Sequence, residues 1–471
     1  MTNESPRRPD AIETLVDFVL GTRFEDLPAD VVASTLRFIR DNIGDTYAGA
    51  SAAGCPEIAR LVKGWGGAQE SRLLGWRTRV PMPQAVWVNS TQSRALELDD
   101  VHEPGLMHAT SGSVPVALAV AEMVGSRTGR DLITATALGI EVSCRLAMAP
   151  EVSSAISGMS FTFQCTTFGA AVTAGLLMGL DAGTMRNAMG IAYSQVAGNQ
   201  QTLREGALMT RVQQGLSAKS GALAALLARQ GIDGPREVLE GRFGYFRVYH
   251  ADRYDRRAVV DGLGARWEIR EISTKPYPCC RYIHSTVRAI ADLTSARRID
   301  VGDIDSVSVQ INNREQFNLV CEPLEQKQRP RTVAEAQFSV PYVTAAALRR
   351  GGLTLDDFTE RALADETVLD LARRVVPCID PQFENLARAA YPAAHVQLCL
   401  RSGEILTARS PAQAPGHPTQ PLTEAERLAK FRDCMSAAPE RLPEAGLARL
   451  IARLDRLQDA DDLSGLWELL P

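Results

Sequence analysis

Residues 166–180, TTFGAAVTAGLLMGL, form a helix-length stretch that is apolar nearly all round. A helix without a polar face must be covered on every side, so this segment belongs in a protein interior. Three more segments have the same composition, rich in alanine and glycine: 113–125, 131–149 and 217–231. Small residues let neighbouring helices approach closely. We therefore expect these four segments to pack together as the middle of a helical bundle.

The same segments argue against a membrane protein. None of these apolar runs reaches the ~18 residues that a membrane-spanning helix needs. The N-terminal sequence MTNESPRRPDAIETL also lacks the apolar core of a secretory signal. We therefore expect a cytoplasmic protein with no membrane partner. A net charge of −5 further argues against general nucleic-acid binding, which needs a basic surface.

The cysteines fit a reduced intracellular protein. The chain has nine of them, an odd number, and none are spaced as CxxC. This pattern predicts neither a zinc cluster nor a disulfide framework, so we expect mostly buried thiols. With 471 residues, of which 45% are hydrophobic, the chain should make two domains with large cores.

The texture of the sequence changes near residue 270. Before it, the pattern is mostly helical from Ala11 onward. After it, residues 306–314 and 393–410 alternate apolar and polar side chains, which is typical of strands, the second with a hairpin at Ser402-Gly403. Helical segments, 284–298 and 340–352, accompany these strands.

A Pro-rich segment, PAQAPGHPTQP at 411–421, precedes a final helical region. We expect the C-terminal helices to return to the first domain. The sequence thus predicts a mainly α protein: a large all-α helical-bundle domain made of 1–270 and 411–471, and a smaller α+β domain made of 271–410.

Charged residues are concentrated at Leu96–Gly112, LELDDVHEPGLMHATSG. The segment holds Glu97, Asp99, Asp100, His102, Glu103 and His108. Burying carboxylates costs several kcal/mol each unless they are paired, so such a loop between two buried helices indicates a functional role. A histidine beside a carboxylate is a common acid/base pair near neutral pH.

Two other interpretations of this segment remain open. Surface acids could precede a helix that Ser111 or Ser113 caps. Alternatively, Asp99, Asp100, His102 and His108 could be metal ligands, although their spacing matches no familiar metal-binding pattern.

A second cluster, KPYPCCRYIHSTVRAI, occupies 275–290 at the predicted domain junction. Lys275, Arg281 and His284 are three potential cations within ten residues. Pro276 and Pro278 favour an extended backbone around Lys275. Domain junctions often form pockets, so we expect a binding site here, although a hinge with surface cations is the alternative.

Five segments, in this order, resemble the MmgE/PrpD family, which includes 2-methylcitrate dehydratase, cis-aconitate decarboxylase and iminodisuccinate epimerase. They are LELDDVHEPGLMHATSGSVPVALAVAE, TTFGAAVTAGLLMGLD, GALAALLARQGIDGPREVLEGRFGYF, KPYPCCRYIHSTVRAI and TVAEAQFSVPYVTAAALRRGGLTLDDF. The resemblance covers about residues 10 to 460. It implies a helical bundle with an α+β lid domain, usually as a homodimer, and chemistry without a metal or an organic cofactor.

Members of the family remove water, carbon dioxide or an α-proton from small di- and tricarboxylates. By position, the resemblance makes His108 the acid/base residue and Lys275 the active-site lysine. Asp99 or Asp100 would orient the histidine. Three more positions are retained or conservatively changed and would bind substrate: Glu97, Arg281 and His284.

The sequence departs from the family at several site positions. Ser160 stands in place of a histidine, Thr210 of a lysine and Gln213 of a histidine, next to a retained Arg211. Cys280 stands where the decarboxylase has a histidine, and its active-site tyrosine is not evident near residues 318–322. His102 is a candidate to replace a lost histidine. Because unpaired substrate charges cost several kcal/mol each, we expect a substrate less charged than methylcitrate or cis-aconitate.

These observations predict a cofactor-independent lyase or isomerase that abstracts a proton next to a carboxylate or carbonyl. The reaction would be a dehydration, a decarboxylation or an epimerisation. A tailoring cyclase or isomerase of secondary metabolism is an alternative on the same fold. A catalytically inactive binding homologue and a metal hydrolase are the other two classes.

Overall fold

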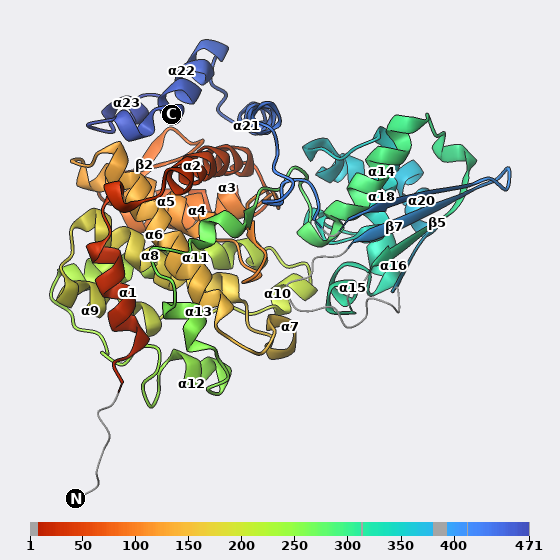
Figure 1. Cartoon of the computed structure of the whole chain (residues 1–471). Helices are drawn as coiled ribbons and strands as arrows, with labels where there is room; N and C mark the ends of the chain where they lie inside the picture. Colours follow the sequence, from red (N-terminus) through yellow and green to blue (C-terminus); the bar gives the residue numbers. More distant parts are fainter. Residues whose placement is uncertain (1–7, 312–313, 380–392, 412, 471) are drawn as a thin grey trace, which may run out of the picture.

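The computed structural model describes residues 8–311, 314–379, 393–411 and 413–470. Figure 1 shows a large helical body and, beside it, a smaller body that contains the main sheet. The C-terminal helices lie back on the large body. The protein is mainly α, as the sequence predicts.

The centre of the large body is α8 (Phe161–Met178). It packs against α5 (Thr110–Val124), α6 (Gly129–Met148) and α11 (Met209–Arg229). These are the four segments whose apolar composition predicted a bundle interior, so that prediction is confirmed. In turn, α11 packs against α4 (Met82–Arg94), the helix that leads into the charged segment.

The remaining elements of the large body surround these helices. They are α1 (Ala11–Gly21), α2 (Ala29–Gly49), α3 (Cys55–Trp65), α7 (Ser154–Ser157), α9 (Ala182–Tyr193), α10 (Gln201–Arg204), α12 (Tyr245–His250), α13 (Arg256–Val260) and the short strands β1 (Ser71–Leu73) and β2 (Thr78–Val80). The side chain of Asp10 caps α1 by accepting a hydrogen bond from the amide of Ile12, where the sequence predicts the start of a helix.

The apolar length of α8 was underestimated from the sequence. Among the described residues, α8 is a helix long and apolar enough to cross a membrane by length and composition. It begins at Phe161, before the quoted stretch, and reaches 18 residues. It is nevertheless 94% buried inside the protein, as a core helix is.

Glycines allow the core helices to touch. A Cβ atom placed on Gly221 of α11 would lie 2.2 Å from the backbone oxygen of Thr167 in α8 and 2.6 Å from the Cβ of Ala170. The spacing of α8 and α11 therefore depends on the missing side chain.

We expect Gly221→Ala to lower the Tm by several degrees, because forcing a methyl group into a filled core costs about 1–3 kcal/mol. Gly64→Ala is the matched control, since no atom lies within 4 Å of the added carbon there. That change should leave the Tm unchanged or raise it, because alanine is the better helix former. Thermal melting followed by circular dichroism compares the two variants. Equal effects would mean that the contact between α8 and α11 does not limit stability.

The smaller body is built on a sheet with strand order β6-β5-β7-β8. The strands are β5 (Ile304–Ile311), β6 (Val375–Ile379), β7 (Ala394–Leu400) and β8 (Ile405–Ser410). β5 runs parallel to β6 and antiparallel to β7, and β7 and β8 form the hairpin predicted at Ser402-Gly403. Gly403 has a φ of 87°, which glycine adopts without strain.

Helices cover this sheet. α14 (His284–Ala296) packs on β7 and β8, and α18 (Val340–Arg350) packs on α14. The other helices of this body are α15 (Arg314–Val320), α16 (Leu324–Gln328), α17 (Val333–Gln337), α19 (Glu360–Leu363) and α20 (Glu366–Arg373). We call the body formed by α14–α20 and β5–β8 the lid domain.

The chain then returns to the bundle. α21 (Glu424–Ala437) and α22 (Glu444–Asp455) pack against α2, and α23 (Ser464–Trp467) follows. One hydrophobic core contains residues between 11 and 272 together with residues between 431 and 470, whereas a second contains residues between 279 and 400. On this basis we propose the domain boundaries near 270 and 410.

A two-residue ladder joins the charged segment to the start of the lid domain. β3 (Val101–His102) pairs antiparallel with β4 (Ile272–Ser273), so that Val101 lies opposite Ser273. This pairing brings segments that are 170 positions apart in the sequence to one place, just before Lys275.

Candidate active site

A cavity of about 640 Å³ is lined by residues of both the bundle and the lid domain. Its wall contains parts of both charged clusters. Seven of the predicted site residues line it: Glu97, His108, Ser160, Thr210, Lys275, Cys280 and Arg281.

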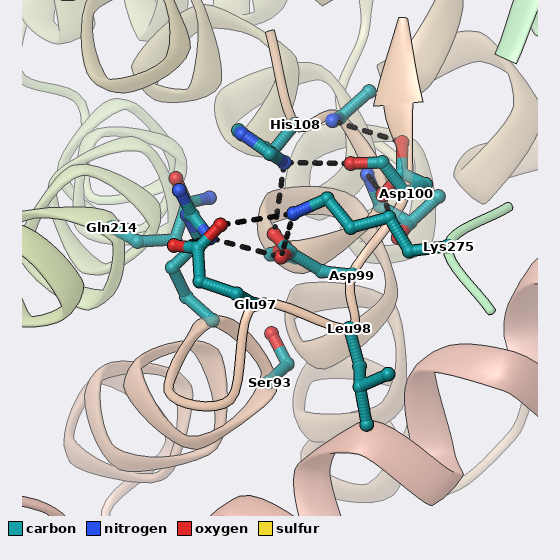
Figure 2. Close-up of polar contacts among 12 residues, drawn as sticks. Ser93, Glu97, Leu98, Asp99, Asp100, His108, Gln214 and Lys275 are labelled. Atoms are coloured by element: carbon teal, nitrogen blue, oxygen red, sulfur yellow. Dashed lines mark hydrogen bonds and ion pairs between the residues drawn. The ribbon is translucent and has the colours of Figure 1, made fainter. Parts of the chain in front are cut away.

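Two cations and two carboxylates form a buried network beside this cavity (Figure 2). The Nζ atom of Lys275 lies 3.0 Å from Oε2 of Glu97 and 3.5 Å from Oδ1 of Asp99. Arg94, at the end of α4, pairs with Glu97 and lies 3.0 Å from Oδ1 of Asp99. The four charges therefore compensate one another inside the protein.

The network keeps its carboxylates ionised. Burial alone would raise the pKa of Asp99, but the charges of Arg94 and Lys275, with the hydrogen bond from His108, outweigh it and hold that pKa well below its usual value. For Glu97, burial is likewise outweighed by Arg94 and Lys275, so its pKa is also lowered. The turn that presents Glu97 has a φ of 54°, a left-handed conformation that is uncommon outside glycine.

The hydrogen bonds of His108 define its protonation. Its Nδ1 atom lies 2.6 Å from the backbone oxygen of Asp100 and 3.2 Å from Oδ2 of Asp99. A carbonyl oxygen only accepts, so Nδ1 carries the hydrogen. Burial and the charge of Arg94 lower the pKa of His108, which favours the neutral ring. In that tautomer Nε2 has a free lone pair, as a general base requires.

Asp100 acts through its backbone more than through its side chain. Its carboxylate accepts hydrogen bonds from the amides of Ala109, at 3.3 Å, and Thr110, at 3.1 Å, at the start of α5. Asp99 is the carboxylate that faces the ring, and Ser111 donates to its Oδ2 at 2.7 Å. Burial and the charge of Asp99 raise the pKa of Asp100 to about 7.

Most of the chain matches the domains of one known family. Residues 13–257 match the MmgE/PrpD N-terminal domain, and residues 277–455 match the MmgE/PrpD C-terminal domain. The chain belongs to the MmgE/PrpD family. The resemblance noted in the sequence is therefore confirmed.

Several relatives of this chain are named as cis-aconitate decarboxylases or as similar to them. The cis-aconitate decarboxylase of Aspergillus terreus is 27% identical over 470 residues, covering 95% of this chain and 93% of the relative. The cis-aconitate decarboxylase-like protein oryM of Aspergillus oryzae is 25% identical over 97% of this chain and 96% of the relative. Human cis-aconitate decarboxylase is 26% identical over 97% and 94%, respectively.

Three predicted MmgE/PrpD site residues are bound away from the cavity. His102 is fully buried, with Nε2 3.2 Å from Oε2 of Glu268. Arg211 donates to the backbone oxygen of Ala53 at 3.1 Å. Gln213 accepts a hydrogen bond from the amide of Asn199 at 3.0 Å and thereby fixes the segment before α10. These three residues do not line the cavity, so they can affect a substrate only by positioning residues that do.

Arg281 and His284 organise the lid side of the site. Arg281 lines the cavity, and its Nε lies 3.0 Å from Oε1 of Glu103. Its other nitrogens donate to the backbone oxygens of Ala414, at 3.0 Å, and Pro415, at 2.7 Å. His284 is fully buried behind it, and burial with the charge of Arg281 holds its pKa well below the usual value. The Pro-rich segment predicted as a linker is thus docked on the site.

The neutral replacements lie on the cavity wall. Ser160 begins the turn into α8, and Thr210 lies in the first turn of α11. The hydroxyl of Thr210 is buried and has no hydrogen-bond partner within the described residues. Burial raises the pKa of Cys280 to about 12, so its thiol is neutral.

The sequence analysis missed two residues that form or support the charged network. Arg94 is the one charged residue in 82–94, an anomaly that could have revealed it. Lys430 does not stand out in the same way, because the helix that contains it has many charged residues. Its Nζ donates to the backbone oxygen of Leu98 at 2.9 Å and to Asp41 at 2.8 Å, so α21 supports the charged segment from behind.

The side chains considered as metal ligands are not arranged around a common point in the described residues. Within 8–311, 314–379, 393–411 and 413–470, no group of three or more His, Cys, Asp or Glu side chains is arranged to hold a metal ion. Around Asp99, the neighbouring positions are occupied by Arg94, Lys275 and the ring of His108.

Proposed function

We propose that the protein is a cofactor-independent lyase or isomerase that transfers a proton at carbon next to a carboxylate or carbonyl group. The neutral His108 carries this proposal. Its Nδ1–H is held by Asp100 and faces Asp99, while its unprotonated Nε2 belongs to a side chain that lines the cavity. Such a ring is oriented and poised to accept a proton.

Groups in the site account for both the proton and the electron pair of the proposed first step. Nε2 of His108 takes the proton from carbon and becomes an imidazolium, and the electron pair passes to the oxygen of the neighbouring carbonyl or carboxylate. Lys275 and Arg94 stabilise the negative charge as it develops, while Asp99 stabilises the imidazolium. Loss of a group from the adjacent carbon, protonated by the imidazolium when it leaves as water, then completes a lyase reaction. In an epimerisation, the other face takes a proton from solvent and the imidazolium releases its own proton to solvent.

Decarboxylation is the second candidate, because the relatives named above are decarboxylases. In that reaction carbon dioxide leaves first, and the carbanion must receive a proton. His108 would need to begin as the imidazolium, and the charges of Arg94 and Lys275 oppose this form. The charges around His108 therefore favour proton abstraction as the first step.

Neutral groups on the wall support a substrate less charged than methylcitrate or cis-aconitate. Ser160, Thr210 and Cys280 supply no charge to the cavity. The volume of about 640 Å³ falls within the roughly 300–1,000 Å³ typical of sites for drug-sized ligands. This size also suits the alternative function, a tailoring cyclase or isomerase acting on a larger acid.

Hydrogen exchange tests the proposal directly. The protein is incubated in deuterated water with a panel of tricarboxylates, dicarboxylates, mono-acids and β-keto esters, and loss of C–H signals is followed by NMR. We expect at least one acid to exchange. If ligands bind in the cavity but no C–H exchanges, the protein is an inactive binding homologue. If carbon dioxide is released without exchange of the substrate itself, decarboxylation is the first step.

We also propose a cytoplasmic homodimer that forms through an apolar patch on α3 and α11. Its exposed side chains are Leu61 (46%), Trp65 (54%), Leu208 (42%), Met209 (42%) and Leu216 (36%). The two helices adjoin, since Lys219 of α11 lies 5.9 Å from the ring of Trp65.

Trp65→Glu should convert the dimer to a monomer in sedimentation equilibrium, because it places a charge in the centre of the patch. Ile405→Glu, at an exposed position of β8, is the control and should remain a dimer. A dimeric Trp65→Glu variant would place the interface elsewhere.

A further inference from the structure

We propose that Arg204 and Lys327 form an anion subsite in this cavity, which binds a carboxylate of the substrate other than the group at which His108 acts. The inference rests on the proposed function, since it assumes that the cavity receives the substrate. It assigns a binding role to two residues that neither cluster of the sequence contains.

The charge balance of the wall identifies these residues. Five Lys and Arg side chains line the cavity: Arg94, Arg204, Lys275, Arg281 and Lys327. Arg94 and Lys275 are paired with Glu97 and Asp99, and Arg281 is paired with Glu103. In the described part of the chain, Arg204 and Lys327 form no salt bridge. The wall also carries Glu315 and Glu322, and within the described residues no salt bridge joins either of them to Arg204 or Lys327. The other three cations are already compensated, whereas Arg204 and Lys327 have no carboxylate partner in this part of the chain.

Lys327 is held in place by backbone groups. Its Nζ donates to the carbonyl oxygens of Leu319 and Phe338, each at 2.7 Å. An ammonium group has three hydrogens, so one remains for a ligand. Burial lowers the pKa of Lys327 to about 8, which leaves it mostly protonated at neutral pH. A partly desolvated cation with a free hydrogen is a strong partner for a carboxylate.

The surroundings of Lys327 explain why an anion would stabilise it. Both side chains line the same cavity, and the charge of Arg204 contributes to the lowered pKa of Lys327. The other titratable groups with the largest influence on its pKa are Cys280, Cys321 and Glu335. Burial raises the pKa of both thiols above the physiological range, and Glu335 is paired with Arg331. A bound carboxylate would relieve the repulsion between the two cations.

Arg204 is exposed, but the backbone that carries it is fixed. It ends α10. Asn199, two residues before this helix, is bound by Gln213, and Gly206, two residues after it, abuts Glu335 of α17. Thr210 contributes a buried hydroxyl without a partner in the described residues to the same wall. This hydroxyl can donate a further hydrogen bond to the anion.

The subsite defines the substrate class more closely. Leu203, Leu319 and Phe338 line the cavity next to the two cations. We therefore expect an acid whose carboxylate is attached to an apolar portion, with the acidic C–H elsewhere in the molecule. One or two carboxylates satisfy this wall, in keeping with a substrate less charged than a tricarboxylate.

The test compares hexanoate and adipate with the neutral hexanamide by isothermal calorimetry at pH 7. The wild-type protein should bind the acids more tightly than the amide. Lys327→Gln and Arg204→Gln should each weaken acid binding by about 10-fold or more, with little effect on the amide. Arg229→Gln, an exposed arginine at the end of α11, is the control and should bind as the wild type does.

Several outcomes would overturn the subsite: no preference for acids over the amide, unchanged acid binding in both variants, or equal loss in the Arg229→Gln control. Because Lys327 also binds two carbonyl groups, its variant could lose stability, and Arg204→Gln then decides alone. Lys327→Arg adds a pH test. Acid binding should decline above about pH 8 in the wild type but not in this variant.

The subsite and the proposed chemistry can fail separately. His108→Ala should lower the rate of hydrogen exchange by about 10²-fold or more and leave hexanoate binding unchanged. If acids bind through Arg204 and Lys327 but no panel member exchanges, the subsite stands and the catalytic proposal falls. If exchange occurs and neither subsite variant alters acid affinity, the catalytic proposal stands and the subsite falls.

Discussion

His108→Ala should lower turnover by about 10²-fold or more, because it removes the group that we propose accepts the proton. Binding of hexanoate should be retained, since the ring is not part of the anion subsite. The measurement is the initial rate of exchange or turnover with the best substrate of the panel. His395→Ala is the matched control, as His395 lies in β7 and hydrogen-bonds Gln310. Full activity of His108→Ala would exclude this residue as the base.

The pH dependence of the wild-type protein is a second test of the role of His108. A base must be neutral to act, so kcat/KM should be lost as the pH falls through the pKa of His108. Burial and the charge of Arg94 place that pKa below the ordinary value of 6.5. The rate should therefore be flat near pH 7 and decline only in more acidic solution. A decline beginning above pH 7 would contradict a neutral resting histidine.

Lys275→Met should cost about 3–5 kcal/mol of stability, because it leaves buried carboxylates without one of their two cations. Glu97 and Asp99 would then share Arg94 alone. Thermal or denaturant unfolding measures the loss. The double variant Lys275→Met/Glu97→Gln restores the charge balance and should recover part of it. Lys63→Met, at an exposed position of α3, is the control and should change stability little.

The same substitution should also alter catalysis in a specific way. The charge of Lys275 helps to lower the pKa of His108. Its removal should therefore shift the acidic limb of the kcat/KM profile to higher pH, as well as lowering the rate. An unchanged limb in a folded Lys275→Met protein would show that Lys275 and His108 are electrostatically independent.

Periodicity and local composition were sufficient for the architecture. An apolar stretch without a polar face, such as the one in α8, has few alternatives to a bundle interior. Alternation in β5 and β7 and the glycine at the hairpin predicted three strands of the lid-domain sheet, whereas β6 was not predicted. The length of α8 was misjudged because its first turn, from Phe161, contains Thr162 and Gln164.

The site was only partly accessible from the sequence. Local density of charge drew attention to Glu97, Asp99 and His108, and the family resemblance paired them with Lys275. Which atom of Asp100 would contact His108 depends on the backbone path, and sequence alone does not contain it. Arg204 and Lys327 lie in short helices of ordinary composition, so only the packing of α10 against the lid domain reveals them.

The support that α21 gives to the charged segment has a consequence for how the enzyme matures. Lys430 belongs to the last tenth of the chain, yet it holds the carbonyl of Leu98 between Glu97 and Asp99. During synthesis, the base and its carboxylates emerge from the ribosome long before this anchor does. A nascent chain should therefore remain inactive until α21 has been synthesised and has docked on the charged segment.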